Sequence, residues 1–492
     1  MSHACTLRIL PADISIDVRP GSSLRELLFD HGVGFPCGGK SVCGGCRVRV
    51  IEGHAPIDDA MRARLSPAEL DAGWRLACRL RAEGDMIIET PGARRDFDRS
   101  AFAAPNRIPL SSRLGLAVDV GSTTLAAELV DLDSGETLAA DGRINPQTMY
   151  GSDIMTRAMF SLHDARLTSM IRRAVGEMIA SLAGEASEKI ASVVLVGNTV
   201  MHHLFAGHNL ESLVHAPFES PHCAEWRTTA AEIGWRLPPA TVIRFLRSVG
   251  GFVGSDILAG VAACHLMDGG GPVAMIDLGT NGEIAVRYGD RALCASTAAG
   301  PAFESANISC GMLAVDGAIA HVSCKDGRLM GEVIGSGDAH GLCGSGVVAA
   351  VAEALRANMI LPNGRIANRA SALFIEPGVE LSQADVRELQ LAKAAVASGL
   401  QLVLEQLGAR PSELLRIYLC GSFGNRVRVE SAKHLGLFAD AHCEVVACGN
   451  TALHGAKLEL LSPGMLDSLS LEHFSLASAE HFQSSFVDCL QF

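Results

Sequence analysis

Four cysteines near the start of the chain have the types and spacing of a metal-binding ligand set. Cys37, Cys43 and Cys46 form a C-x5-C-x2-C motif, and Cys78 follows in a separate RLACRL segment. Four thiolates are the full ligand set of a 2Fe-2S cluster, and the intervening glycines let a loop wrap closely around it. A structural zinc site is the alternative, but such sites usually pair two C-x2-C knuckles, and here the second knuckle is missing. The motif favours the iron-sulfur cluster.

A second chemical pattern occurs twice in the rest of the chain. Residues 114–131 read LGLAVDVGSTTLAAELVD, a buried strand that ends in Asp119, a turn and a second strand. Residues 273–286 read VAMIDLGTNGEIAV, with Asp277 in the place of Asp119. Such a hairpin can point N–H and hydroxyl donors at a phosphate, and the strand-end aspartate can hold Mg²⁺ or its water. One hairpin alone could be an ordinary tight turn, but the duplication predicts two similar α/β lobes that hold a nucleotide between them.

These hairpins resemble the two phosphate motifs of the acetate and sugar kinase, Hsp70 and actin superfamily. Residues 415–427, LRIYLCGSFGNRV, are similar to its adenosine motif, and residues 193–207 are similar to a connecting strand and helix of its first lobe. The resemblance implies an ATP site. The residues expected to bind the nucleotide are Gly121, Ser122, Thr123, Thr124, Gly279, Thr280, Asn281, Gly282, Gly421, Ser422, Phe423 and Gly424.

Other polar residues are weaker candidates. Asp256, in GGFVGSDILAG, could join Asp119 and Asp277 in catalysis by positioning the attacking water, or it could equally cap the following helix. Glu304 lies close to the second hairpin in sequence and could belong to the same site. An ordinary loop carboxylate without a functional role is the favoured interpretation. His202 and His203 are adjacent, so on a helix their side chains point about 100° apart and would not both bind one metal. We expect these histidines to be structural.

The elements around the cysteines resemble a known small fold. Residues 6–10 and 14–18 alternate like strands, residues 24–30 are expected to form a helix opened by a capping box of Ser23 and Glu26, and residues 47–53 form a further strand. This order resembles the β-grasp fold of 2Fe-2S ferredoxins over roughly residues 1–92. The plant-type motif is C-x4-C-x2-C, so the first gap here is one residue longer.

The predicted fold class is therefore an α+β β-grasp 2Fe-2S domain followed by a duplicated α/β ATPase domain of the RNase H-like, actin, Hsp70 and sugar-kinase type. Two long segments, residues 386–408 and 471–492, show apolar residues at helical spacing and are expected to pack on the lobes. The expected domains are 1–95 for the ferredoxin, 96–113 for a linker and 114–492 for the ATPase, with lobes at about 114–270 and 271–492.

Composition and charge exclude several classes of function. Of the 492 residues, 41 are Lys or Arg and 54 are Asp or Glu, and the net charge of −13 disfavours binding to nucleic acid. The sequence shows no signal peptide and no apolar run of about 18 residues, so no membrane association is expected. The fifteen cysteines are then expected to be mostly reduced thiols of a cytoplasmic protein.

Across its length, the chain resembles the reductive activators of corrinoid proteins. The phrases GNTVMHHLFAG, GPAFESANISCGM, VRELQLAKAAVASG and FVDCLQF are similar to that family. The resemblance implies a 2Fe-2S cluster, ATP and Mg²⁺ as cofactors, and a corrinoid protein of a methyltransferase system as partner. Family members reduce its Co(II) to Co(I) with ATP, using an electron donor that the sequence does not identify.

The resemblance has one departure, and two other functions stay open. The better-known activators carry a further domain before the ATPase, whereas only about twenty residues separate the two domains here, which leaves a homodimer open. A small-molecule kinase with a fused ferredoxin is one alternative, although no acceptor-pocket motif is recognisable. An electron carrier that works without ATP is the other.

Overall fold

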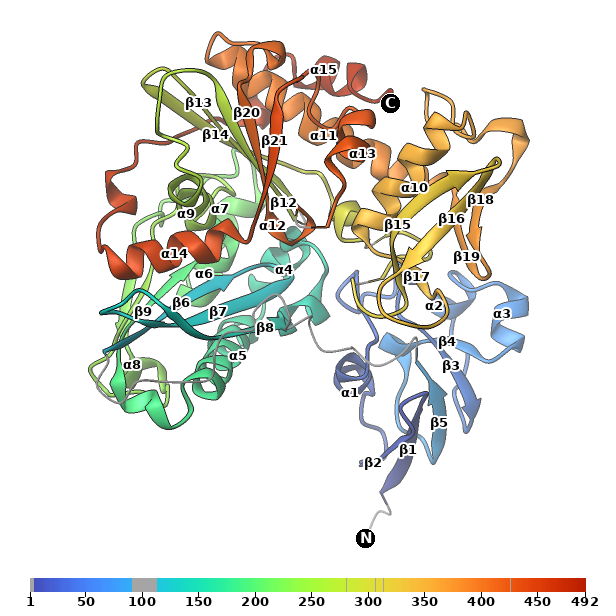
Figure 1. The fold of residues 1–492 in the computed structure, drawn as a ribbon. Coiled ribbons are helices and arrows are strands. Elements are labelled where there is room, and N and C mark those ends of the chain that lie inside the picture. The colour runs from blue at the N-terminus through green and yellow to red at the C-terminus, as the bar shows by residue number, and fades with distance from the viewer. Residues whose placement is uncertain (1–3, 91–112, 280, 306, 313, 425) are drawn as a thin grey trace. The chain divides into compact units, whose positions relative to one another are not determined.

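The computed structural model describes residues 4–90, 113–279, 281–305, 307–312, 314–424 and 426–492 (Figure 1). The chain divides into two compact units. The first contains Met1–Phe97 together with Ile144–Asp164, and the second contains Asp98–Arg143 together with Ala165–Phe492. Almost all of the expected linker, residues 96–112, lies outside the described residues, as does Thr280. Within the described residues, every helix is too short or too polar to cross a membrane.

The first unit is built on a five-stranded mixed sheet in the order β2-β1-β5-β3-β4. Alternation explains β1, in which Cys5, Leu7 and Ile9 are buried while the residues between them face solvent. The strands are β1 (Cys5–Leu10), β2 (Ile14–Val18), β3 (Arg47–Glu52), β4 (Trp74–Leu76) and β5 (Met86–Glu89). The short helices are α1 (Arg25–Asp30), α2 (Asp59–Arg62) and α3 (Pro67–Asp71), with the 3₁₀ turn η1 at Ala77–Arg79. The predicted strands of this unit are confirmed.

Two features of the first unit differ from expectation. The capping box at α1 is wrong, because Leu24 is the N-cap residue and Ser23 instead forms a bridge with Arg81. The unit also takes in residues 144–164, which the sequence analysis assigned to the first lobe. They form η3 (Pro146–Tyr150) and α4 (Ile154–Ser161). Asn145 and Asp153 cap these two elements through their side chains, which explains where each one starts.

The second unit contains two six-stranded sheets of matching topology. Their orders are β10-β11-β9-β6-β7-β8 and β21-β20-β12-β13-β14-β22. In each sheet the hairpin, β6–β7 or β12–β13, has the next strand of the chain on one side, β8 or β14, and a later parallel strand on the other, β9 or β20. The first sheet consists of β6 (Leu114–Val120), β7 (Thr124–Asp131), β8 (Thr137–Ile144), β9 (Ile190–Val196), β10 (Trp226–Thr229) and β11 (Val242–Phe245). The second consists of β12 (Val273–Leu278), β13 (Gly282–Tyr288), β14 (Arg291–Thr297), β20 (Arg416–Cys420), β21 (Glu444–Gly449) and β22 (Glu472–His473). Both predicted hairpins are confirmed.

Helices pack on these two sheets. They are α5 (Arg166–Ala183), α6 (Thr199–Ala206), α7 (Glu211–Val214), α8 (Ala230–Ile233), α9 (Ser255–Ala263), α10 (Gly344–Arg356), α11 (Gln383–Gln406), α12 (Gly421–Gly424), α13 (Val429–His434), α14 (Thr451–Leu461) and α15 (Phe482–Asp488). The sheet of β15 (Ala318–Lys325), β16 (Arg328–Val333) and β17 (Gly341–Leu342) and the pair β18 (Ala372–Glu376) and β19 (Val379–Ser382) complete the unit.

The two predicted long helices have different outcomes. Helix α11 confirms the first, beginning at Gln383 behind a Ser382 capping box. The second is wrong for most of its length, since only Phe482–Asp488 is α-helical and a single 3₁₀ turn occupies Leu476–Ser478. Residues Glu472–His473 pair with β14 instead, so backbone hydrogen bonds to a neighbouring strand override the helical spacing there.

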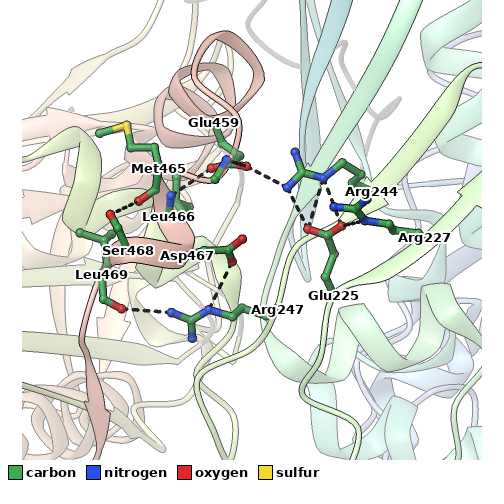
Figure 2. Close-up of polar contacts among 11 residues, drawn as sticks. Glu225, Arg227, Arg244, Arg247, Glu459, Met465, Leu466, Asp467, Ser468 and Leu469 are labelled. Carbon is green, nitrogen blue, oxygen red and sulfur yellow. Dashed lines mark hydrogen bonds and ion pairs between the residues drawn. The ribbon is translucent and has the colours of Figure 1, made fainter.

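Helix α14 follows a strand of the second sheet but packs on the first. Its apolar side chains share one core with α9 and with strands of the first sheet, and Gly455 lies so close to the Ala259 backbone that a Cβ atom would be 2.1 Å from the Ala259 oxygen. Figure 2 shows Arg244 of β11 between Glu225 and Glu459, with its Nη2 2.8 Å from an oxygen of each. Because the Glu459 side chain is only 1 % exposed, this ion pair anchors α14 against the first sheet.

Candidate functional site

The four motif cysteines lie together in the first unit as two pairs. Cys37 is in side-chain contact with Cys43, and Cys46 with Cys78. Gly38, Gly39 and Gly44 have positive φ angles, which glycine adopts without strain, and they give the loop its tight path. Two pairs of sulfurs fit a 2Fe-2S cluster, in which each of the two irons takes two thiolates.

Nearby donors favour the thiolate form of one cysteine in each pair, Cys37 and Cys78, whereas burial raises the pKa of Cys43 and contact with Cys78 raises that of Cys46. Although burial opposes it, N–H groups of Val42, Cys43 and Lys40 lower the pKa of Cys37. Contact with Cys46 lowers the pKa of Cys78 to about 6. Since a cluster is bound by thiolates and tuned by hydrogen bonds to its sulfurs, the loop is suited to hold a negatively charged cluster.

Arg25 connects the cysteine loop to residues 144–164. Its guanidinium lies 4.9 Å from the ring centre of Tyr150 and 5.3 Å from that of Phe35, and it donates a hydrogen bond to the Met149 carbonyl. Gly38 lies so close to Tyr150 that a Cβ atom there would be 2.3 Å from the Tyr150 carbonyl oxygen. The loop is therefore enclosed by a segment from much later in the chain, with a half-buried positive charge beside it.

In the second unit, the structure brings together the three aspartates predicted to be catalytic. Burial raises the pKa of Asp119 to about 6, and burial with the charge of Asp119 raises that of Asp277 to about 7. Burial and both of these neighbours raise the pKa of Asp256 to about 8. Because the charge of Asp119 acts on Asp277 and the charges of both act on Asp256, the ends of the two equivalent strands lie near the start of α9.

Local packing explains these positions. A Cβ atom at Gly254 would be 2.1 Å from the Gly197 carbonyl oxygen, so only glycine lets α9 begin against the turn after β9. Ser255 fixes the same approach, because its hydroxyl accepts from the Gly197 N–H at 3.2 Å. Asp256 then lies in the first turn of α9 and is not its N-cap residue, which is Gly254. Asp256 is therefore not the N-cap residue, but its carboxylate accepts a hydrogen bond of 2.9 Å from the Ile257 N–H in that first turn, so the capping alternative is confirmed in this limited form.

The predicted nucleotide loops are placed next to the aspartates. Gly421 has φ +86°, and a Cβ atom there would be 2.6 Å from Asp277 Oδ1. Thr123 donates a hydrogen bond of 3.1 Å to Glu304, and a Cβ atom at Gly279 would be 3.9 Å from the other oxygen of that carboxylate. Glu304 therefore links the two hairpins, a role that sequence alone favoured less than an ordinary loop carboxylate. The side chains of Ser422 and Phe423 lie outside the described residues.

Two functional candidates were missed by sequence reasoning. Asn450 donates from Nδ2 to Asp119 Oδ2 at 2.9 Å, and it also caps α14 by accepting from the Leu453 N–H. Glu283 pairs with Asp277 across the second hairpin, and burial together with the charges of Asp256 and Asp277 raises its pKa well above the usual range. Glu283 lies within the recognised hairpin, so its place opposite Asp277 could have been read from the pairing of the two strands. Asn450 left no comparable signal.

His202 and His203 are both buried on α6, with 3.4 Å between their Nδ1 atoms. Burial and neighbouring histidines lower the pKa of His202 to about 3, and burial lowers that of His203 to about 4, so both are neutral near pH 7. His203 Nδ1 lies 2.7 Å from the Thr199 carbonyl oxygen, one turn earlier in α6. These surroundings are those of structural histidines.

Comparison with known proteins supports the division into a ferredoxin-type domain and an ATPase domain. A model of the 2Fe-2S iron-sulfur cluster binding domain matches residues 7–83. A model of the RACo middle region matches residues 114–269, and one of the C-terminal ASKHA domain of RACo matches residues 272–492. The fold class is confirmed: a ferredoxin-type domain is joined to an actin-like and sugar-kinase-like ATPase domain.

Relatives that match about three quarters of the chain identify the family. The corrinoid activation enzyme RamQ of Eubacterium limosum is 32 % identical over 418 residues, which cover 76 % of this chain and 69 % of that protein. The [Co(II) methylated amine-specific corrinoid protein] reductase of Methanosarcina barkeri is 26 % identical and covers 76 % of both chains. A solved structure, a reductive activator for corrinoid, iron-sulfur protein, has the same fold with a TM-score of 0.69 at 23 % identity, covering 99 % of this chain and 98 % of that one. The chain belongs to the RACo family of corrinoid reductive activators.

Proposed function

We propose that this protein uses ATP hydrolysis to drive a one-electron reduction of the Co(II) corrinoid of a methyltransferase corrinoid protein to Co(I). The observation that carries the proposal is the pairing of two sites on one chain. One unit holds two thiol pairs suited to a 2Fe-2S cluster. The other holds a group of carboxylates where duplicated hairpins meet. An electron carrier and an ATPase are both needed when an electron transfer runs uphill.

The energetics are consistent with this coupling. A plant-type cluster has a potential near −400 mV, and the Co(II)/Co(I) couple is expected to be more negative still. A one-electron gap of ~100 mV corresponds to about 2.3 kcal/mol. ATP binding and hydrolysis can overcome such a gap by favouring a conformation in which the corrinoid accepts an electron more readily.

The proposed roles of the residues follow from their positions. Cys37, Cys43, Cys46 and Cys78 hold the cluster, which supplies one-electron transfer when bound. Asp119 and Asp277 would hold Mg²⁺ or its water ligands, since carboxylates are the oxygen ligands that Mg²⁺ prefers. The twelve loop residues named above bind ATP through their backbone N–H and hydroxyl groups. With a raised pKa, Asp256 is suited to take a proton from the attacking water.

The corrinoid protein is the proposed partner, and an electron donor of unknown identity reduces the cluster. All fifteen cysteines are unpaired thiols, which supports the proposal of a reducing, cytoplasmic location. The acidic surface expected from the net charge of −13 leaves nucleic acid out of the proposed partners.

The test is anaerobic visible spectroscopy of a Co(II) corrinoid protein mixed with this protein and a reductant, with and without MgATP. We expect the Co(I) band only with MgATP. The D256N variant should lose the ATP-dependent reduction while keeping its iron content. The C43S variant should keep ATP hydrolysis and lose reduction, and C324S, which changes a thiol on β15, serves as the matched control.

Other outcomes distinguish the alternatives. A Co(I) band of equal size without ATP would show an electron carrier that does not need the nucleotide. A phosphorylated product formed from ATP and a candidate acceptor, with no Co(I) band, would show a small-molecule kinase.

A further inference from the structure

Three cysteines outside the predicted cluster site converge in the second unit. Cys264, Cys420 and Cys448 have sulfur atoms that all lie within 4.8 Å of one another. Among the described residues, they form the sole group of three or more potential metal-ligating His, Cys, Asp or Glu side chains at this spacing. Cys264 and Cys420 are buried, and Cys448 is half-buried.

The sulfur spacing matches a shared cation. Cys264 Sγ lies 3.8 Å from Cys420 Sγ. Two thiolates that bind one zinc ion at about 2.3 Å are about 3.8 Å apart in tetrahedral geometry. The thiols of Cys264 and Cys420 are therefore already at the separation that a bound ion requires, and Cys448 Sγ lies within 4.8 Å of both.

The backbone directs Cys448 toward the other two cysteines. In the pairing of β20 with β21, Leu419 is opposite Ala447 and Cys420 is opposite Gly449, so Cys448 is the extra residue of a β-bulge. A bulge turns the side chain of its extra residue away from the normal alternation and is common beside functional sites. Cys264 comes from the C-cap of α9, so three separate elements supply the three sulfurs.

We propose that Cys264, Cys420 and Cys448 form a binding site for a thiophilic divalent cation, with zinc as the expected ion. Binding replaces the thiol protons with Zn²⁺, and the protons leave to solvent. A divalent ion suits the site because Asp277, the register partner of Cys420, adds negative charge nearby. Half-exposed Cys448 leaves a side from which a water molecule completes the coordination.

Such an ion would cross-link three segments that lead into the proposed nucleotide site. Cys420 precedes Gly421, which contacts Asp277, and Cys448 is two residues before Asn450, which contacts Asp119. Cys264 ends the helix that starts beside Asp256. The ion would hold together three elements at the aspartate group: α9, which carries Asp256, and the segments that carry Gly421 and Asn450.

The test measures zinc binding to the full-length protein with its iron-sulfur cluster intact. Iron and zinc per chain are determined by elemental mass spectrometry, and affinity by competition with a chromophoric chelator. We expect one zinc per chain in the wild type, and binding weaker by at least about 100-fold in C448S and in C264S. C324S keeps three intact thiols at the site and should bind zinc like the wild type.

Thermal unfolding gives a second readout, because an ion that binds only the folded state raises the melting temperature. Zinc should raise it in the wild type and in C324S, but not in C448S. The proposal is overturned if C448S with full iron content binds zinc as tightly as the wild type, or if the wild type binds none. Isolation with a disulfide between two of the three cysteines, persisting in the presence of zinc, would also overturn it in favour of a redox pair.

Discussion

Asn450 donates a hydrogen bond to Asp119 across 331 residues of sequence, with 2.9 Å between Nδ2 and Oδ2. The same side chain accepts from the Leu453 N–H and thereby begins α14. One residue thus caps the helix that follows the second sheet and orients the aspartate that ends the first hairpin. The hydrogen bond favours the ionised form of Asp119 and partly offsets the effect of burial on its pKa.

The two roles of Asn450 can be separated by substitution. Serine at this position still caps a helix but is too short to keep the bond to Asp119. N450S should therefore unfold close to the wild-type temperature, whereas N450A should lose about 1 kcal/mol of stability. Both variants should hydrolyse ATP more slowly, and their pH profiles should shift upward because the pKa of Asp119 rises. An unchanged profile in N450S would show that the bond does not tune Asp119.

Binding of Mg-nucleotide should release protons. The pKa values of Asp119, Asp277 and Asp256 are raised to about 6, 7 and 8, so part of the group is protonated at pH 7 and must ionise to meet a cation. Affinity should rise as pH increases from 6 to 8. Calorimetry in buffers of different ionisation enthalpy measures the release, which should be smaller in D256N. Equal proton release in D256N and the wild type would contradict the assignment.

The raised pKa values of the three aspartates also predict how stability depends on pH in the absence of nucleotide. A carboxyl group whose pKa is raised by folding stays protonated longer in the folded state, so stability falls as pH rises from the unfolded value near 4 through the folded value. D256N removes the carboxyl group that has the most strongly raised pKa of the three aspartates, about 8. It should therefore raise the melting temperature of the nucleotide-free protein, more at pH 8 than at pH 5. Differential scanning calorimetry at the two pH values provides the measurement.

Arg25 should raise the midpoint reduction potential of the cluster. Its positive charge lies near Cys78, Cys37 and Cys46, so it stabilises the more negative, reduced state. R25Q should make the midpoint potential more negative by a few tens of millivolts, on the order expected for one partly screened charge. Redox titration followed by visible absorbance measures this shift. R62Q, which removes an exposed arginine of the same unit, should leave the potential unchanged.

The ion pair of Arg244 with Glu459, which anchors α14, should contribute far more to stability than the exposed ion pair of Arg247 with Asp467. In E459Q, buried Arg244 keeps Glu225 but loses one charged partner, and we expect a loss of about 1–3 kcal/mol of unfolding free energy. Asp467 lies 3.6 Å from Arg247 and has a side chain that is 61 % exposed. D467N should lower the unfolding free energy by less than about 0.5 kcal/mol. Similar losses in both variants, measured by urea denaturation, would argue against the anchoring role.

Much of the fold was predictable because its signals are local. Strand alternation, glycine-rich turns and the cysteine motif depend on residues close in sequence, and both hairpins lie where they were expected. The capping box at Ser23 failed because a bridge to Arg81 holds that residue in another conformation. The last predicted helix failed because β14 offers Glu472–His473 a strand partner.

What sequence could not provide is the pairing of distant segments. Asn450 looks like an ordinary helix cap until the first sheet is present. Cys448 looks like one of many scattered thiols until a bulge turns it toward Cys420. These contacts depend on the tertiary arrangement of the second unit, which no local pattern encodes.

The inclusion of residues 144–164 in the first unit has a consequence for synthesis of the chain. The four cysteines leave the ribosome well before Tyr150 and Ser152, whose backbone lies against the cysteine loop. During translation there is thus an interval in which the loop is complete in sequence but still uncovered. A cluster inserted in that interval would meet thiols that the later segment does not yet cover.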